Sequence, residues 1–375
     1  MADLQQNLMR LKTACKNPRS QLDYYLKQGK KVIGCFPAFT PEELVHSSGM
    51  IPMGLWGGQI EPKLAKSYLP AFACPIMQAN MEFGLRGTYK GLSAVIIPAL
   101  CDTLRCMTQN WRFGVTDIPM IPIVYPQNRE SIASTNYLIS EFEIALAMLA
   151  TITGQMMNEK ALSDTILIYN EHNTIMREFV KVANEHLDII TPSVRHEVMK
   201  SSFFFEKAEH TTIVKDIIAG LKKIPAYKYT GKKVILTGIA CEPNVLLNIL
   251  QKNDVAVVGD DLVHESQQFR TDIPETGGGA LKRLALQWSN RYGCSLIHEL
   301  GKKRGKLLID ICKSNNANGV INCLMKFCDP EEYDQPYLER ALREVNIPVT
   351  TIAIDQQCTS VEQFHTRIQG FCELL

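Results

Sequence analysis

A buried strand that passes through a cysteine into a helix constrains this sequence more than any other stretch. The apolar run 319–327 predicts a strand buried on both faces. The letters DPEE at 329–332 predict a helix start, because Asp can cap, Pro suits the first turn and carboxylates favour the positive end of the helix dipole. Cys328 therefore lies between the two, where ligands of open α/β sheets bind.

Two further cysteines occupy the same kind of position. Cys101 follows an almost wholly apolar strand predicted over 92–100, and a helix predicted over 104–113 comes next. Cys74 precedes Pro75 at the predicted start of another helix. A helix N-terminus favours the thiolate, which is the form of cysteine that binds metal. Cys74, Cys101 and Cys328 are therefore candidate metal ligands.

The order of strands and helices predicts an α/β fold with two doubly wound, parallel-sheet (Rossmann-like) units. The expected boundaries are an N-terminal helix in 1–30, a first α/β unit in 31–130, a helical connecting region in 131–225 and a second α/β unit in 226–375. The strands are predicted over 31–36, 51–56, 92–100 and 120–125, then over 234–239, 255–258, 319–327 and 348–354. Two such units facing each other would bring the three cysteines into one cleft.

Length and charge restrict the class of protein. A chain of 375 residues is long for one core, so two domains are expected. Lys and Arg number 40 against 39 Asp and Glu, with no basic block, so neither nucleic acid nor membrane is an expected partner. The chain contains no apolar window of about 18 residues and no signal-peptide pattern, which predicts a cytoplasmic protein.

The cysteine count is high, but most of the cysteines need no special role. The chain has 12 cysteines and no C-x-x-C pair, which argues against zinc ribbons, ferredoxin-type clusters and thioredoxin chemistry. Most are expected to be buried as small hydrophobic residues. Three thiolates suit an iron–sulfur cluster with one open iron, or a Cys₃ zinc site. Cys241 lies at a similar strand exit, and Cys106 and Cys323 lie near the chosen ligands, so these three remain alternatives.

Other polar features are weaker candidates. The glycines at 277–279 predict a flexible turn, because they lack the Lys-Ser/Thr pair of a phosphate-binding loop. Asp260-Asp261 is expected to cap a helix or to lie in a solvated loop. His172, His210 and His264 have no metal-ligand spacing and are expected on the surface of helices.

Several motifs together resemble the 2-hydroxyacyl-CoA dehydratase family, which is related to benzoyl-CoA reductase subunits. They are CDT at 101–103, KFCDP at 326–330, Cys74-Pro75, FTPEEL at 39–44 and GMIP at 49–52. The resemblance extends over nearly the whole chain. It implies a [4Fe–4S] cluster, and Cys74, Cys101 and Cys328 match the family's ligands.

The resemblance also implies an activity and partners. It implies a lyase of amino-acid fermentation in anaerobes that converts an (R)-2-hydroxyacyl-CoA, such as 2-hydroxyisocaproyl-CoA, into the (E)-2-enoyl-CoA. Water leaves by syn elimination through a ketyl radical, because a low-potential electron inverts the polarity of a thioester whose β-hydrogen is not acidic. The implied partners are a homologous alpha subunit in a heterodimer and an ATP-hydrolysing iron–sulfur activator protein.

One departure from the family pattern favours a beta-type subunit whose cluster relays the electron. A substrate-binding subunit is expected to carry a serine and a glutamate near the first strands. Here Cys35 ends the first predicted strand, and no acid follows the second strand until Glu61. The acyl-CoA is therefore expected mainly at the partner subunit, and no general acid or base is assigned. A benzoyl-CoA reductase-type subunit and a non-catalytic iron–sulfur electron carrier remain alternatives.

Overall fold

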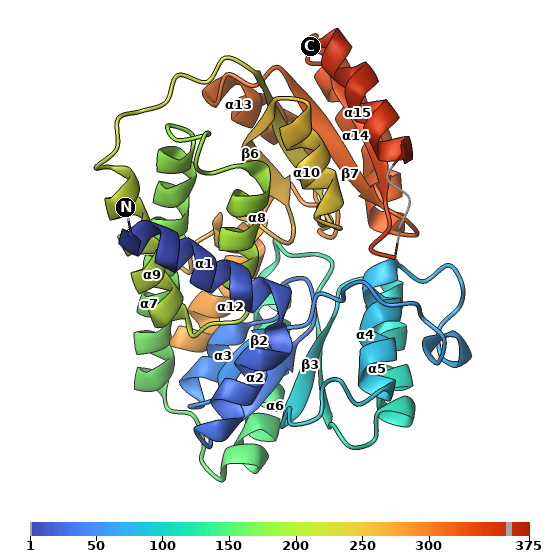
Figure 1. The fold of residues 1–375 in the computed structure, drawn as a ribbon. Coiled ribbons are helices and arrows are strands. Elements are labelled where there is room, and N and C mark those ends of the chain that lie inside the picture. Colours follow the sequence, from blue (N-terminus) through green and yellow to red (C-terminus); the bar gives the residue numbers. More distant parts are fainter. Residues whose placement is uncertain (1, 358–361) are drawn as a thin grey trace.

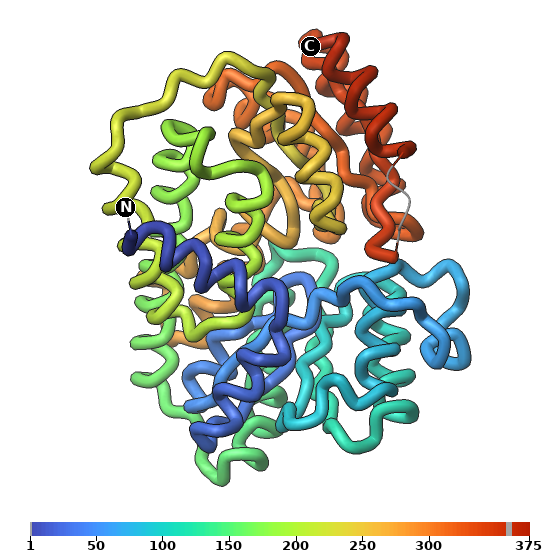
Figure 2. Tube along the Cα trace, in the orientation of Figure 1, coloured from blue at the N-terminus to red at the C-terminus, as the bar shows by residue number. Residues whose placement is uncertain are grey.

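The computed structural model describes residues 2–357 and 362–375 (Figures 1 and 2). Within these ranges two four-stranded sheets form, and every strand pair is parallel. This confirms the predicted fold class of two doubly wound units. The residue boundaries of the four predicted regions stay a prediction. The strands are β1 (Val32–Cys35), β2 (Ile51–Gly54), β3 (Ala94–Ala99), β4 (Met120–Val124), β5 (Lys232–Gly238), β6 (Val255–Leu262), β7 (Gly319–Met325) and β8 (Val349–Ile354).

Both sheets have the same strand order. The first runs β2-β1-β3-β4 and the second β6-β5-β7-β8. In each unit the second strand in the sequence pairs with one edge of the first strand, and the third strand pairs with its other edge. The order reverses between β1 and β3, and again between β5 and β7. A crevice for ligands forms at the carboxyl ends of such strand pairs. Cys101 follows β3 and Cys328 follows β7, so they occupy equivalent positions in the two units.

The N-terminal segment forms two helices where one was expected. α1 (Ala2–Lys16) ends before Asn17, and α2 (Pro18–Lys27) begins directly after it. The Asn17 side chain accepts a hydrogen bond from the N–H of Ser20, and Pro18 has no N–H with which to continue α1. The first unit then contains α3 (Glu42–Ser47), η1 (Ala65–Ser67), α4 (Pro75–Leu85) and α5 (Asp102–Gly114).

Four helices connect the two units. They are α6 (Ile132–Thr153), α7 (Glu159–Ala183), α8 (Pro192–Ser201) and α9 (Lys207–Leu221). α1 packs on α8 and α9, and with α7 they enclose a separate hydrophobic core. Residues 225–230, largely exposed, then run from α9 toward β5 as an extended trace over the outside of the molecule (Figures 1 and 2).

The second unit is tied back to the first. Its helices are α10 (Val245–Lys252), α11 (Ser266–Phe269), α12 (Ala280–Asn290), α13 (Arg304–Ser314), α14 (Asp329–Glu344) and α15 (Glu362–Leu374). α12 packs on α6 and α7. The helix expected from Cys241 begins only at Val245, and the helix expected from Leu300 begins only at Arg304. Among the described helices, none combines the length and apolar character that crossing a membrane requires.

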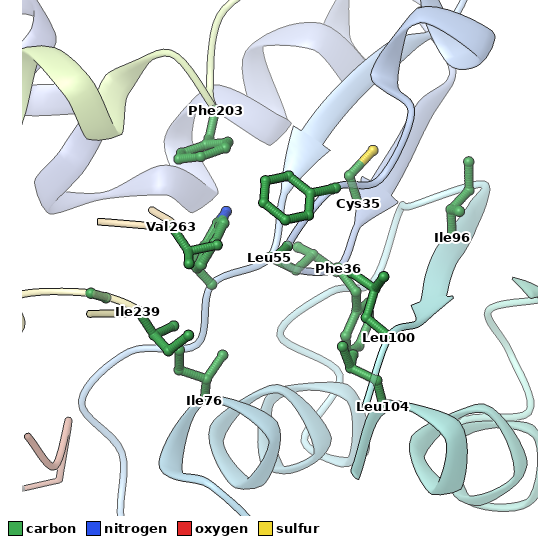
Figure 3. Close-up of a cluster of buried hydrophobic side chains, with 14 of the residues drawn as sticks. Cys35, Phe36, Leu55, Ile76, Ile96, Leu100, Leu104, Phe203, Ile239 and Val263 are labelled. Atoms are coloured by element: carbon green, nitrogen blue, oxygen red, sulfur yellow. The ribbon is translucent and has the colours of Figure 1, made fainter. Parts of the chain in front are cut away.

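One hydrophobic core is continuous across the two units. Strands such as β1 and β3 are buried along their whole length, because helices cover both faces of each sheet. Leu55 and Ile76 of the first unit belong to the same buried cluster as Ile239 and Val263 of the second. Figure 3 shows Ile76 beside Ile239 at this junction. The ends of the parallel strands therefore meet across an interface that contains buried apolar residues of both units.

Candidate functional site

The three predicted cysteines are the N-caps of three helices. Cys74 precedes α4, Cys101 precedes α5 and Cys328 precedes α14. All three side chains are partly buried. The strand-to-helix positions read from the sequence are therefore correct for Cys101 and Cys328, and Cys74 lies at the helix start that was predicted.

The structure brings these three thiols within electrostatic reach of one another. Cys101 raises the pKa of Cys74, and both of these residues raise the pKa of Cys328. Asp329, the residue after Cys328, raises the pKa of Cys101. Two thiols come from the first unit and one from the second, so they meet at the junction of the units.

The alternative cysteines lie elsewhere. Cys241 and Cys323 are buried in the second unit, where Cys323 raises the pKa of Cys241 well above its ordinary value. Cys106 is exposed on α5, more than a turn beyond Cys101. Neither the buried pair nor Cys106 shares the electrostatic interaction that links the three N-capping thiols.

Burial, and not the helix N-terminus, dominates the pKa of each thiol. It raises the pKa of Cys74 to about 12 and that of Cys328 well above its ordinary value. The N–H groups of Ile76 and Met77 lower the pKa of Cys74, as predicted, although their geometry falls short of a capping hydrogen bond. The predicted effect of the helix N-terminus is therefore present, but burial outweighs it. A metal ion would supply the positive charge that the thiolate form requires.

The donor set fits a polynuclear cluster better than a single ion. Among the residues that the structure describes, one group of three, His196, Glu242 and His264, brings metal-ligand atoms within 4.8 Å of one another. The three cysteines do not form such a group. Ligands of an iron–sulfur cluster bind different irons, so their sulfur atoms lie farther apart than those around one ion. Three sulfurs with nearby backbone N–H groups and an apolar surround suit such a cluster.

The turn before Cys328 has an unusual backbone. Phe327 has a φ of 58°, in the left-handed region that residues other than glycine rarely adopt. Its side chain is about half exposed, at 46%. Lys326 pairs with Asp355 at the end of the neighbouring strand β8, with 3.1 Å between Nζ and Oδ2. This turn sets the direction in which α14 and its N-capping thiol leave the sheet.

A pocket of about 430 Å³ lies near this junction. Its walls come from the N-terminal helices, the segment after β2, α8 and the loops after β5 and β8. They include Cys15, Arg19, Trp56, Gly57, Lys200, Glu242 and Gln356. A Cβ atom on Gly57 would lie 3.2 Å from the Cα of Ile76, so the pocket wall is continuous with the first turn of α4.

Two consecutive glutamines join the units beside the pocket. Gln356 Nε2 donates to the carbonyl of Trp56 and to Glu242 Oε2, each at 2.9 Å. Gln357 Nε2 donates to the carbonyl of Gly58, and its Oε1 accepts from the N–H of Ile60 at 2.7 Å. The end of β8 is therefore bonded to the segment that follows β2.

Several buried charged residues beside this pocket were not predicted from the sequence. His196 Nδ1 lies 2.7 Å from Glu265 Oε1, and His196 Nε2 lies 3.3 Å from Glu242 Oε1. Burial lowers the pKa of His196, but its bonds to the two carboxylates outweigh this and raise the pKa to about 9. Lys200 also bonds to Glu242. No local pattern links these residues, because they come from α8 and from two different loops.

The histidines and aspartates expected at the surface are in fact buried. His172 and His210 hydrogen bond across 3.1 Å between α7 and α9, and His264 is 1% exposed. Asp260 and Asp261 lie at the end of β6, where Asp260 pairs with Arg195 at 2.9 Å. Tertiary packing covers these groups, and the only local signal was that the two aspartates directly follow an apolar strand.

Comparison with known proteins agrees with the family resemblance. The family model described as "2-hydroxyglutaryl-CoA dehydratase, D-component" matches residues 37–375. Lactoyl-CoA dehydratase subunit beta of Anaerotignum propionicum is 42% identical over 377 residues, which is 100% of both chains. The (R)-phenyllactyl-CoA dehydratase beta subunit of Clostridium sporogenes is 41% identical over 97% of both. A benzoyl-CoA reductase subunit of Thauera aromatica is 24% identical over 85% of this chain and 84% of its own.

Proposed function

Because the chain belongs to the 2-hydroxyglutaryl-CoA dehydratase D-component family, we propose that it is the beta-type subunit of a 2-hydroxyacyl-CoA dehydratase. Its reaction removes water from an (R)-2-hydroxyacyl-CoA and yields the (E)-2-enoyl-CoA. Two relatives that match over almost their full length are named as beta subunits of such dehydratases. A homologous alpha subunit is the partner that this role requires.

Cys74, Cys101 and Cys328 are the proposed ligands of a [4Fe–4S] cluster. The observation that carries this proposal is that three N-capping cysteines from both units interact at one junction. When bound, such a cluster supplies one-electron transfer at low potential.

The residues around the thiols suit a low reduction potential. Asp102, Asp329 and Glu331 each raise the pKa of a neighbouring thiol through their negative charge. The same charges oppose the arrival of an additional electron, and net charge and solvent exposure are among the factors that set the potential of a cluster. The three partly buried thiols pack against the hydrophobic core at the junction, which limits their exposure to solvent.

The proposed role of this subunit is to relay an electron, with the acyl-CoA bound mainly by the alpha subunit. Cys35 is buried at the end of β1, and the Glu61 side chain is 72% exposed and pairs with Lys63. Neither residue offers a carboxylate to a substrate at the carboxyl ends of the strands. An ATP-hydrolysing iron–sulfur activator would deliver the electron. The acyl group, for which 2-hydroxyisocaproyl is our candidate, requires a direct comparison of substrates.

Metal analysis of matched cysteine variants tests the proposal. The chain, purified without oxygen together with its alpha partner, is expected to hold about four iron and four sulfide in this subunit. Cys101→Ala should lose them, whereas Cys106→Ala, on the same helix but exposed, should keep them. Iron retained in Cys101→Ala, or lost equally in both variants, would contradict the ligand assignment.

The similarity to a benzoyl-CoA reductase subunit defines the second candidate function. Activated complex should dehydrate 2-hydroxyacyl-CoA esters, including the lactoyl, phenyllactyl and 2-hydroxyisocaproyl forms, and should leave benzoyl-CoA unchanged. Reduction of benzoyl-CoA would favour the second candidate. An electron carrier without catalytic function would instead purify without a stoichiometric partner of similar fold.

A further inference from the structure

We propose that His196, Glu242 and His264 form a second metal site, separate from the cysteines, that binds one divalent transition-metal ion, with Zn²⁺ the best match. Their ligand atoms lie within 4.8 Å of one another, and all three residues are buried. Two imidazoles and one carboxylate are an established ligand set for zinc.

The spacing of the ligand atoms is close to that around a bound ion. With bonds of about 2.1 Å, two ligands of a tetrahedral zinc ion lie roughly 3.4 Å apart. His196 Nε2 and Glu242 Oε1 are already 3.3 Å apart. All three ligand atoms lie within 4.8 Å of one another, so His264 has to approach by at most about 1.4 Å.

His264 gives the independent sign that a ligand is missing. It is 1% exposed, and neither its Nδ1 nor its Nε2 has a hydrogen-bond partner among the described residues. Buried polar groups are almost always paired, and an unpaired one costs about 1–3 kcal/mol. Its ring stacks on Phe203 at 5.2 Å with an interplanar angle of 2°. The packing therefore fixes the plane of an imidazole whose nitrogens have no partner in the protein.

The surroundings of His196 match those of a metal ligand. Its second ring nitrogen, Nδ1, lies 2.7 Å from Glu265 Oε1. A histidine that binds metal almost always donates its other N–H to a carboxylate or carbonyl, which fixes the ring orientation. Glu242 is oriented in the same way, because its Oε2 accepts a hydrogen bond from Gln356 at 2.9 Å. Its Oε1 accepts from Lys200, and the ion would take the place of the Lys200 ammonium group at that oxygen.

Charge at the site is compatible with a divalent cation. Glu242 and Glu265 contribute two negative charges, and an ion would take the place of the proton between His196 Nε2 and Glu242 Oε1. Lys200, whose side chain is 19% exposed, borders the pocket and can turn toward it. Glu242 also lines the pocket, which leaves a fourth position open to water from that side.

The ion would join three segments that are distant in the sequence. His196 belongs to α8, Glu242 to the loop after β5 and His264 to the loop after β6. Zinc bound there would fix the helical connecting region onto the carboxyl ends of the second sheet. This site contains no cysteine, so its occupancy is independent of iron loading.

Zinc analysis of the oxygen-free complex with its alpha partner tests the site. After treatment with a chelator and dialysis against Zn²⁺ alone, we expect about one zinc in this subunit. X-ray absorption at the zinc edge should show only nitrogen and oxygen neighbours, with imidazole scattering. His264→Leu should lose this zinc and retain its iron. His172→Leu, which alters another buried histidine, should keep both metals.

A second variant covers the case in which His264→Leu fails to fold. Glu265→Gln leaves the three ligands in place and should weaken zinc affinity 10- to 100-fold. Absence of zinc from the wild-type chain, sulfur neighbours around the zinc, or unchanged affinity in Glu265→Gln would each overturn the proposal. None of these results depends on whether the complex dehydrates an acyl-CoA.

Discussion

Gly57 lies where the two units and the first turn of α4 meet. Its φ is +74°, and a Cβ atom there would lie 2.6 Å from Gln356 Oε1 and 3.2 Å from the Cα of Ile76. The first contact would displace the end of the Gln356 side chain, and the second would push the α4 backbone, which cannot move without displacing Cys74. The absence of a side chain at Gly57 therefore helps to position Cys74, a candidate ligand.

Gly57→Ala should reduce the iron content of the anaerobically purified subunit more than it reduces the folded fraction. The substitution adds steric overlap at α4 to the strain of a positive φ. Gly87→Ala is the matched control, because Gly87 has a φ of +73° but nothing within 4 Å of its added Cβ. Iron analysis and circular dichroism of both variants measure the difference, and equal iron loss would show that steric overlap at Gly57 has no role.

Glu43 makes stability depend on pH. Burial raises the pKa of its carboxyl from 4.5 to about 7. An acid whose pKa is higher in the folded state contributes stability that is complete below its unfolded pKa. That contribution declines as the pH rises from about 4.5 through 7.

Glu43→Gln should remove this dependence. Between pH 5 and 8 the wild-type subunit should lose on the order of 2 kcal/mol of unfolding free energy relative to the variant. Urea titrations of both proteins at the two pH values measure the difference, in which the titration of all other groups cancels. A difference that does not change with pH would mean that the carboxyl titrates normally.

At the level of residues, the sequence predicted where a residue lies along a helix or strand better than it predicted the burial and contacts of its side chain. Cys74, Cys101 and Cys328 were placed correctly at helix starts, because capping and strand endings are local properties. The burial of His264 and the pairing of His196 with Glu242 were not foreseeable. Those contacts depend on loops that meet only in the folded chain.

At the level of elements, apolar strands were easy to find and helix starts were harder. All eight predicted strands are present within the described residues. β6 runs on to Leu262, through Asp260 and Asp261, because arginines neutralise these two aspartates inside the protein. The sequence pattern alone suggested that the strand stops before them.

Arg304 joins four of these elements through buried charges. Its Nε lies 2.9 Å from Asp261 Oδ2 on β6, and its Nη1 lies 2.9 Å from Glu331 Oε1 and 3.2 Å from Asp334 Oδ2 on α14. Its Nη2 donates to Thr237 on β5 at 2.8 Å. One side chain at the start of α13 therefore fixes α14, the helix that Cys328 caps.

Arg304→Met should destabilise the second unit by about 3–5 kcal/mol, because it leaves buried carboxylates without a counter-charge. The urea midpoint of the complex measures this loss. The control is Arg343→Met. Arg343 pairs with Glu339, but its side chain is 72% exposed, so the substitution should change stability by no more than about 0.5 kcal/mol. Comparable effects in the two variants would argue against a structural role for the buried charges.

At the scale of the whole molecule, alternation of strands and helices was enough to predict two α/β units. The common strand order, which makes Cys101 and Cys328 equivalent, could not be read from the sequence. Nor could the packing of α12 on α6 and α7, or the bonds from Gln356 to Trp56 and Glu242. These features depend on pairings between distant segments, and only the folded chain determines them.

The exposed segment 225–230 has a consequence for how the molecule can be taken apart. A break there would yield two polypeptides, each with a complete sheet, and α12 of one would dock between helices of the other. Cys74 and Cys101 would belong to the first fragment and Cys328 to the second. Neither fragment would carry all three proposed cluster ligands, so on that proposal iron uptake by a mixture would report fragment complementation directly.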